Sequence, residues 1–153
     1  MPDIEWANAD GSAAELAAFF HEGEGTPTAQ QWRGLIEAPD TGPICVVNFI
    51  KFRREANYES NASDTPCTGA EAFMRYGAKS APRIAAVGGT MIFAGRFERT
   101  IIGADEDWDA VILASYPNRK SFLQLFHDAE YRDAFRHRRA AVAHYRAIVG
   151  AAR

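Results

Sequence analysis

The stretch ICVVNFIKF, residues 44–52, constrains the fold of this chain more than any other feature. It is rich in β-branched and aromatic residues, follows a proline and leads into a charged loop, as a strand does. Side chains of a strand alternate between two faces. Both sets are apolar here, with Ile44, Val46, Ile50 and Phe52 opposite Cys45, Val47 and Phe49. A strand with two apolar faces must be covered on both sides.

The same pattern returns further along the chain. In residues 107–116, DWDAVILASY, the set Trp108, Ala110, Ile112 and Ala114 opposes Val111 and Leu113. Residues 90–99, TMIFAGRFER, predict another strand between these two. The last apolar run, residues 145–150, is compatible with more helix or with a short fourth strand, and we favour the strand.

Helices are predicted between and before these strands. Ser12 with Glu15, and Thr68 with Glu71, have the spacing of a capping box, so helices should begin there. A helix capped by Thr26 should run to Pro39, and Asn118 and Asp128 should cap two further helical segments. The resulting order predicts an α+β ferredoxin-like sandwich, an antiparallel sheet with helices on one face.

Residues 1–41 are interpreted as an N-terminal helical extension and residues 42–153 as the ferredoxin-like domain. Because helices cover one face of such a sheet, the other apolar face needs separate cover. A second copy of the chain would provide it, so we predict a homodimer with sheets packed face to face, a dimeric α/β barrel. The alternative is that the N-terminal helices fold over that face.

Composition excludes several classes of partner. Of 153 residues, 47% are hydrophobic and 24% charged, with a net charge of -3, so we expect no nucleic-acid partner. No apolar run approaches the roughly 20 residues of a membrane helix, and the N-terminus lacks a secretory pattern. We expect a cytoplasmic protein without membrane contact. Cys45 and Cys67 have no nearby ligand residues, so no metal is predicted.

Four segments are similar to a known family: GPICVVNFIKFR, GAEAFMRYGAKSAPRIAAVGGTMIFAGRFE, DWDAVILASYPNRKSFLQLFHDAEY and HRRAAVAHYRAI. From about Gly42 to Ile148 the chain resembles the domain-of-unknown-function family 1330 of the dimeric α/β-barrel superfamily. Relatives in that superfamily include cofactor-free monooxygenases, muconolactone isomerases and stress-responsive barrel proteins. The resemblance matches the polar positions Asn48, Tyr76, Arg96, the turn 116–119 and the pair His137 and Arg138. It implies no particular activity.

Asn48 places an amide on an apolar strand face, where it must be hydrogen-bonded or wet. It is a candidate to line a small-molecule pocket, or else a structural amide. Arg96 follows a glycine at the end of a strand and could bind a substrate carboxylate. Its alternative is an internal ion pair with Glu98 or Asp109.

His137 is the candidate proton carrier, because histidine titrates near neutral pH. It could share a helix face with His144 if the fourth strand begins later, and its alternative is a hydrogen-bonded or solvated helical histidine. Tyr76 is a second candidate for proton transfer. Arg138 and Trp108 are candidate substrate contacts, although Tyr76 and Trp108 also suit a core or rim position.

Two functions follow from these residues. The first is a pocket for a small hydrophobic or anionic metabolite, with cofactor-independent catalysis of a monooxygenase or isomerase kind. The second is a non-catalytic dimeric binding or structural module. No glycine-rich phosphate loop or nucleophile elbow is present in the sequence, so no cofactor is predicted.

Overall fold

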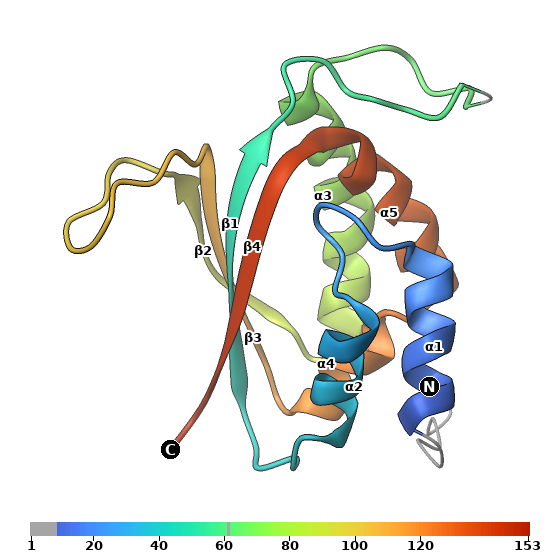
Figure 1. Ribbon diagram of the computed structural model, residues 1–153, viewed down its shortest axis with the longest axis vertical. Helices are drawn as coiled ribbons and strands as arrows, with labels where there is room; N and C mark the ends of the chain where they lie inside the picture. Colours follow the sequence, from blue (N-terminus) through green and yellow to red (C-terminus); the bar gives the residue numbers. More distant parts are fainter. Residues whose placement is uncertain (1–8, 61) are drawn as a thin grey trace.

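The computed structural model describes residues 9–60 and 62–153, which form an α+β fold of five helices and four strands. The helices are α1 (Ala9–Phe20), α2 (Ala29–Glu37), α3 (Gly69–Ala86), α4 (Arg119–Leu125) and α5 (Ala129–Ala141). The strands are β1 (Ile44–Phe52), β2 (Thr90–Arg96), β3 (Ala110–Tyr116) and β4 (Val142–Ala151). Figure 1 shows the sheet on one side of the molecule and all five helices on the other.

The four strands form one antiparallel sheet in the order β2-β3-β1-β4. At one end of β1, Ile44 pairs with Tyr116 of β3, and at the other end Ile50 pairs with Tyr145 of β4. The prediction that residues 145–150 form a strand is confirmed. Since β4 begins at Val142, directly after α5, His137 and His144 do not share a helix, and that proposed pair was wrong.

The two faces of the sheet have different surroundings. On the inner face, toward the helices, Ile44 and Ile50 of β1 are buried, whereas Val47 and Phe49 on the outer face are half-buried. The N-terminal helices α1 and α2 lie on the same side as α3 and α5, so they do not cover the outer face (Figure 1). Within the described residues, that face has no covering layer.

Trp108 corrects the predicted pattern of β3. It was expected to share a face with Ala110, but β3 begins at Ala110 and Trp108 belongs to the preceding connection. Its ring centroid lies 6.0 Å from that of Phe49, on the outer face. The alternation of a strand does not extend into residues that are not part of its ladder.

Most of the predicted helix starts are confirmed. Thr68 and Glu71 form the expected capping box at α3, in which each side chain accepts a backbone N–H of the other residue. Asn118 accepts from the Ser121 N–H at α4, and Asp128 caps α5. These caps satisfy amide groups that have no partner within their helices.

Two predicted caps were wrong. Ser12 lies inside α1, since a separation of three residues between Ser12 and Glu15 also occurs within a helix. Thr26 donates instead to the backbone of the loop before α2. The cap of α2 is Thr28, whose capping box with Gln31 has the same spacing.

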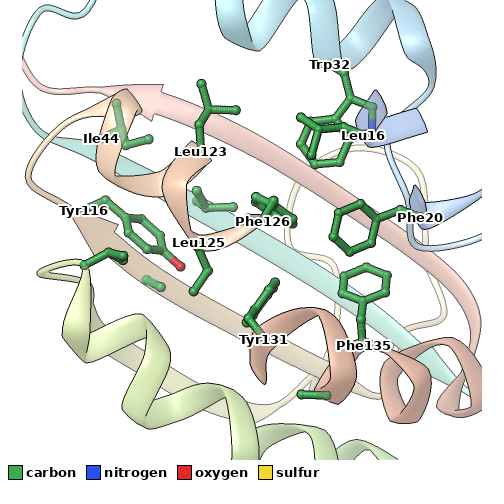
Figure 2. Close-up of a cluster of buried hydrophobic side chains, with 14 of the residues drawn as sticks. Leu16, Phe20, Trp32, Ile44, Tyr116, Leu123, Leu125, Phe126, Tyr131 and Phe135 are labelled. Carbon is green, nitrogen blue, oxygen red and sulfur yellow. The ribbon is translucent and has the colours of Figure 1, made fainter. Parts of the chain in front are cut away.

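The N-terminal helices contribute to the main buried cluster. Leu16, Phe20 and Trp32 pack against Phe126 and Phe135, as Figure 2 shows. The predicted boundary between residues 41 and 42 falls in the turn between α2 and β1, but this cluster contains residues from both sides of it. Burial of these apolar groups holds α1 and α2 against the helical layer.

Candidate functional site

A cavity of about 930 Å³ lies between the inner face of the sheet and the helices. Its sheet side includes Val46, Asn48, Ile112 and Ala114, its helical side includes Phe73, Tyr76, Ile84, Tyr131 and Arg138, and its N-terminal side includes residues 23–27, Gln31 and Leu35. This size and the mostly apolar lining suit a small-molecule site. Of the predicted site residues, the cavity brings together Asn48, Tyr76 and Arg138.

Arg138 is the principal charge of this site. Its Cζ lies 4.2 Å from the ring centroid of Tyr145 and 4.6 Å from that of Phe135, so the guanidinium is held against two aromatic rings. Nη2 donates to the Gly25 carbonyl at 2.8 Å, and Nη1 lies 3.5 Å from the Tyr76 hydroxyl. Nε is buried without a hydrogen bond. Within residues 9–60 and 62–153, no carboxylate forms an ion pair with Arg138.

The surroundings of Arg138 favour its charged form. Burial acts to lower the pKa of Arg138, but the hydroxyl groups of Tyr145, Tyr76 and Tyr131 outweigh it, and the pKa lies above the ordinary value. The guanidinium is therefore a permanent positive charge in the cavity wall.

Two hydrogen-bonded pairs surround this charge. The Tyr76 and Tyr131 hydroxyls are 2.7 Å apart, and the Tyr145 hydroxyl donates to Asn48 Oδ1 at 2.9 Å. Asn48 Nδ2 in turn donates to the Ile112 carbonyl at 3.1 Å, so its amide is bonded at both atoms. Asn48 therefore lines the cavity and is at the same time a structural amide, because its hydrogen bonds join β3 and β4.

Burial keeps three tyrosines of the cavity, Tyr116, Tyr131 and Tyr145, neutral at physiological pH. Burial raises the pKa of Tyr145 to about 12, against the opposing charge of Arg138. Burial also raises the pKa values of Tyr116 and Tyr131. The cavity thus presents uncharged hydroxyl groups beside the Arg138 guanidinium, an arrangement that favours an anionic ligand group.

Gly25 brings the chain over this end of the cavity. Its φ of 83° lies in the left-handed region, and an added Cβ would come within 3.1 Å of Val142 Cγ2. Glycine at this position lets the backbone carbonyl approach Arg138. The sequence alone did not identify Gly25 or Tyr145 as site residues. The one available signal for Tyr145 was the strand alternation along β4, which places its side chain on the same face of the sheet as its partner Ile50.

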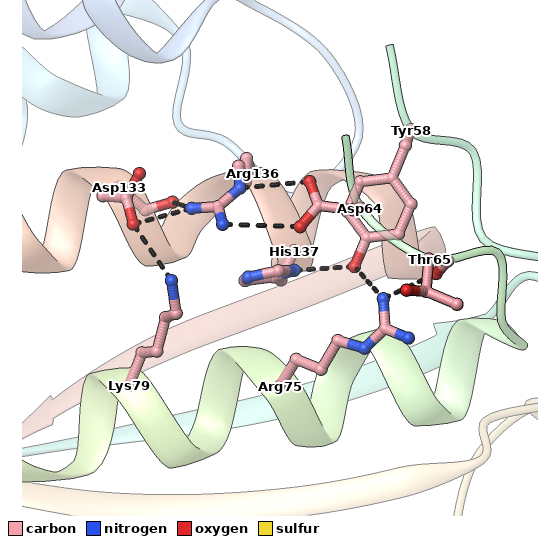
Figure 3. Close-up of polar contacts among 8 residues, drawn as sticks. All are labelled: Tyr58, Asp64, Thr65, Arg75, Lys79, Asp133, Arg136 and His137. Carbon is pink, nitrogen blue, oxygen red and sulfur yellow. Dashed lines mark hydrogen bonds and ion pairs between the residues drawn. The ribbon is translucent and has the colours of Figure 1, made fainter. Parts of the chain in front are cut away.

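His137 lies outside this cavity, in a separate polar cluster between α3, α5 and the loop after β1 (Figure 3). It is buried, and its Nδ1 is 2.6 Å from the Tyr58 hydroxyl. Arg75 donates to the Tyr58 hydroxyl and to the Thr65 carbonyl, while Arg136 binds Asp64. These contacts attach the loop to the helices. Burial, followed by the charge of Arg136, lowers the pKa of His137.

Arg96 and Trp108 also lie apart from the cavity lining. Arg96 is exposed at the end of the edge strand β2. Its two predicted internal partners bind other residues, since Glu98 pairs with Arg99 and Asp109 pairs with Lys51. The structure therefore does not bring Arg96, Trp108 or His137 together with Asn48.

The residues that the structure describes contain no group of three or more histidine, cysteine, aspartate or glutamate side chains placed to hold a metal ion. None of their helices combines the length and apolarity needed to cross a bilayer.

Comparison with known proteins decides the family. The sequence profile described as "Domain of unknown function (DUF1330)" matches residues 63–151. The chain belongs to this family. The resemblance predicted from the sequence is confirmed, although the profile match begins later than Gly42. No functionally curated protein matches the chain.

Two solved structures are similar over most of their length. The crystal structure of RPA0582, a protein of unknown function from Rhodopseudomonas palustris, is 37% identical, with a TM-score of 0.74, covering 84% of this chain and 95% of that chain. The crystal structure of methylated RPA0582 protein is also 37% identical, with a TM-score of 0.74, covering 83% and 93% respectively. DUF1330 membership and these relatives assign no activity.

Proposed function

We propose that this DUF1330 protein binds a small molecule with an apolar body and an anionic group, and that Arg138 pairs with the anion. The observation that carries this proposal is a guanidinium held in the cavity wall by aromatic rings, without a carboxylate partner among the described residues. A buried charge without a counter-charge is costly, and a bound carboxylate or enolate would offset that cost.

The same arrangement supports cofactor-independent chemistry on the ligand, of a monooxygenase or isomerase kind. Arg138 would stabilise negative charge that develops on a carbonyl oxygen, and Tyr76, hydrogen-bonded to Tyr131, would give or accept a proton. Asn48 would orient the ligand from the sheet side. His137 has no role in this proposal, because its hydrogen bond to Tyr58 lies outside the cavity.

Binding is tested by thermal denaturation with octanoate and with its neutral analogue octanamide. Octanoate should raise the melting temperature, since a ligand at 100 times its Kd stabilises by about 2.7 kcal/mol. Arg138→Gln should abolish the shift, and Arg138→Lys should retain part of it. Arg139→Gln is the matched control, because Arg139 neighbours Arg138 but does not line this cavity. An equal response to octanamide, or an unchanged shift in Arg138→Gln, would contradict the proposal.

We also propose that two ferredoxin-like subunits pack sheet to sheet as a dimeric α/β barrel. The outer face carries Val47, Phe49, Phe93, Val111, Leu113 and Ile148. Phe93 on the edge strand β2 and Ile148 on the edge strand β4 are 51% and 50% exposed, and a contiguous exposed apolar face of this kind is typical of a protein–protein interface. A second copy presents a self-complementary surface, as two-fold dimers require.

The dimer is tested by analytical ultracentrifugation over a range of protein concentrations. Leu113→Lys places a charge at the centre of the outer face and should yield monomers. Ile101→Lys changes an 88% exposed residue in the connection between β2 and β3 and should leave the dimer intact. A wild-type chain that remains monomeric at high micromolar concentration would refute this part of the proposal.

A further inference from the structure

A second arginine lines the same cavity. Arg119, the first residue of α4, is half-buried, and its backbone N–H donates to Asp40 Oδ1 at 3.3 Å. Its side-chain Nε is buried without a hydrogen bond, as is Nε of Arg138. Among the residues that the structure describes, no carboxylate forms an ion pair with either guanidinium.

The two arginines lie toward opposite ends of the cavity. Arg119 follows Tyr116, which pairs with Ile44 at the start of β1, whereas Arg138 stacks on Tyr145, whose hydroxyl reaches Asn48. Figure 1 places α4 at one end of the sheet and the C-terminal end of α5 toward the other. Asn48 lies four positions after Ile44 along β1, a span of roughly 13 Å.

The lining between these ends is apolar. Val46 and Ala114 from the sheet, with Ile84, Met91 and Phe122 around them, supply no charged group. A ligand that reached both arginines would therefore place an apolar segment in the middle of the cavity.

The other charged residues of the lining are already paired. Arg146 forms an ion pair with Glu106 at 2.9 Å, and Glu24 lies 3.3 Å from His144 Nδ1 at the exposed rim. Glu24 is the single carboxylate residue of the lining within residues 9–60 and 62–153. The cavity thus carries an excess of positive charge in a chain whose net charge is -3.

We propose that the ligand of this cavity is an elongated dianion, with one carboxylate-like group at Arg138, an apolar middle and a second anionic group at Arg119. This inference rests on the proposed function and adds the second recognition point. Each guanidinium presents a fork of N–H donors that matches a carboxylate. Two charged ends at a fixed separation would make affinity depend on ligand length.

The experiment measures dissociation constants by isothermal titration calorimetry. Wild-type protein is titrated with decanoate, and with the dicarboxylates succinate, adipate, suberate, sebacate and dodecanedioate. A charge-assisted hydrogen bond made to one more carboxylate should tighten binding about tenfold or more. We expect a long dicarboxylate such as sebacate to bind more tightly than decanoate, and succinate to bind weakly because it cannot reach both arginines.

Variants separate the two ends of the cavity. Arg119→Gln should weaken sebacate about tenfold while leaving decanoate within about twofold, whereas Arg138→Gln should weaken both. Arg119→Lys should restore part of the affinity for sebacate. Lys120→Gln, which changes the adjacent cation outside the lining, should bind every ligand as the wild type does.

The outcomes distinguish this inference from the proposed function. If the wild type binds decanoate in an Arg138-dependent way but binds no dicarboxylate more tightly, the dianion is refuted and the proposed function stands. If Arg119→Gln weakens decanoate and sebacate equally, Arg119 has a structural role and the inference is refuted. If the wild type binds neither class, the proposed function fails. The comparison of dicarboxylates of increasing length on wild-type protein decides the inference even if the Arg119 variants do not fold.

Discussion

Truncation of Phe20 should destabilise the protein strongly, because this residue attaches α1 to the rest of the fold. Its side chain is 1% exposed, and its ring centroid lies 4.7 Å from that of Phe135 and 5.6 Å from that of Phe126. The ring of Trp32 is 5.9 Å away. Phe20→Ala would remove a large buried side chain at the meeting point of three helices and of the residues after α4.

The magnitude follows from this burial. Replacement of a buried phenylalanine by alanine costs about 3–5 kcal/mol, and the aromatic contacts place Phe20 in the upper part of that range. At about 2–4 °C per kcal/mol for a chain of this size, the melting temperature should fall by about 8–20 °C. Urea denaturation should show a lower midpoint with an unchanged slope.

Phe19 provides the matched control on the same helix. It is 44% exposed, and its ring lies 4.1 Å from Arg132 Cζ, so Phe19→Ala should lose a cation–π contact worth about 1 kcal/mol. Both variants are compared at one protein concentration, since self-association would shift the midpoint. If Phe20→Ala lowers the free energy of unfolding by no more than Phe19→Ala does, the packing of α1 described above is refuted.

Three further predictions concern stability and pH. Thr68→Ala should lower the free energy of unfolding by about 1 kcal/mol through loss of the α3 cap, measured by urea denaturation. Burial acts to raise the pKa of Asp128, but the hydrogen bond and charge of Arg83 and the backbone N–H groups of Tyr131 and Glu130 together outweigh it, so the folded pKa is lowered. The stabilisation from this lowered pKa is present above the unfolded pKa of about 3.9 and is lost as pH falls. Asp128→Asn should therefore flatten the fall in the free energy of unfolding between about pH 5 and pH 3, a window of about one pH unit on either side of the unfolded pKa. Burial lowers the pKa of His137, so stability should also fall below pH 6.5, about its unfolded pKa. His137→Gln should remove that slope and Tyr58→Phe should keep it; an unchanged slope in His137→Gln would contradict the assignment.

Strand patterns predicted much of the fold, because a strand with two apolar faces leaves a clear signal in a short segment. The apolar runs in residues 44–52 and 107–116 identified the central strands β1 and β3, although β3 begins only at Ala110, and capping residues identified the starts of α3, α4 and α5. Local rules failed where two candidates had equal spacing, as with Thr26 and Thr28 before α2.

The site was harder to predict, because its residues meet through long-range pairing. Asn48, Tyr76 and Arg138 were identified as candidates, but the sequence did not indicate that His137, one position from Arg138, points to a different cluster. Successive residues of a helix point about 100° apart, so neighbours in sequence reach different surroundings. Tyr145 was missed because its role depends on the pairing of β4 with β1, which brings the Tyr145 hydroxyl to Asn48.

The N-terminal side of the cavity has a consequence for how related proteins differ. Residues 23–27, Gln31 and Leu35 line the cavity, and all precede residue 63, where the family profile begins to match. A change in the segment before residue 63 would therefore reshape one wall of the cavity without altering the helices and strands that the profile covers. Exchange of residues 23–35 alone should change which ligands fit, while Arg119 and Arg138 keep their places.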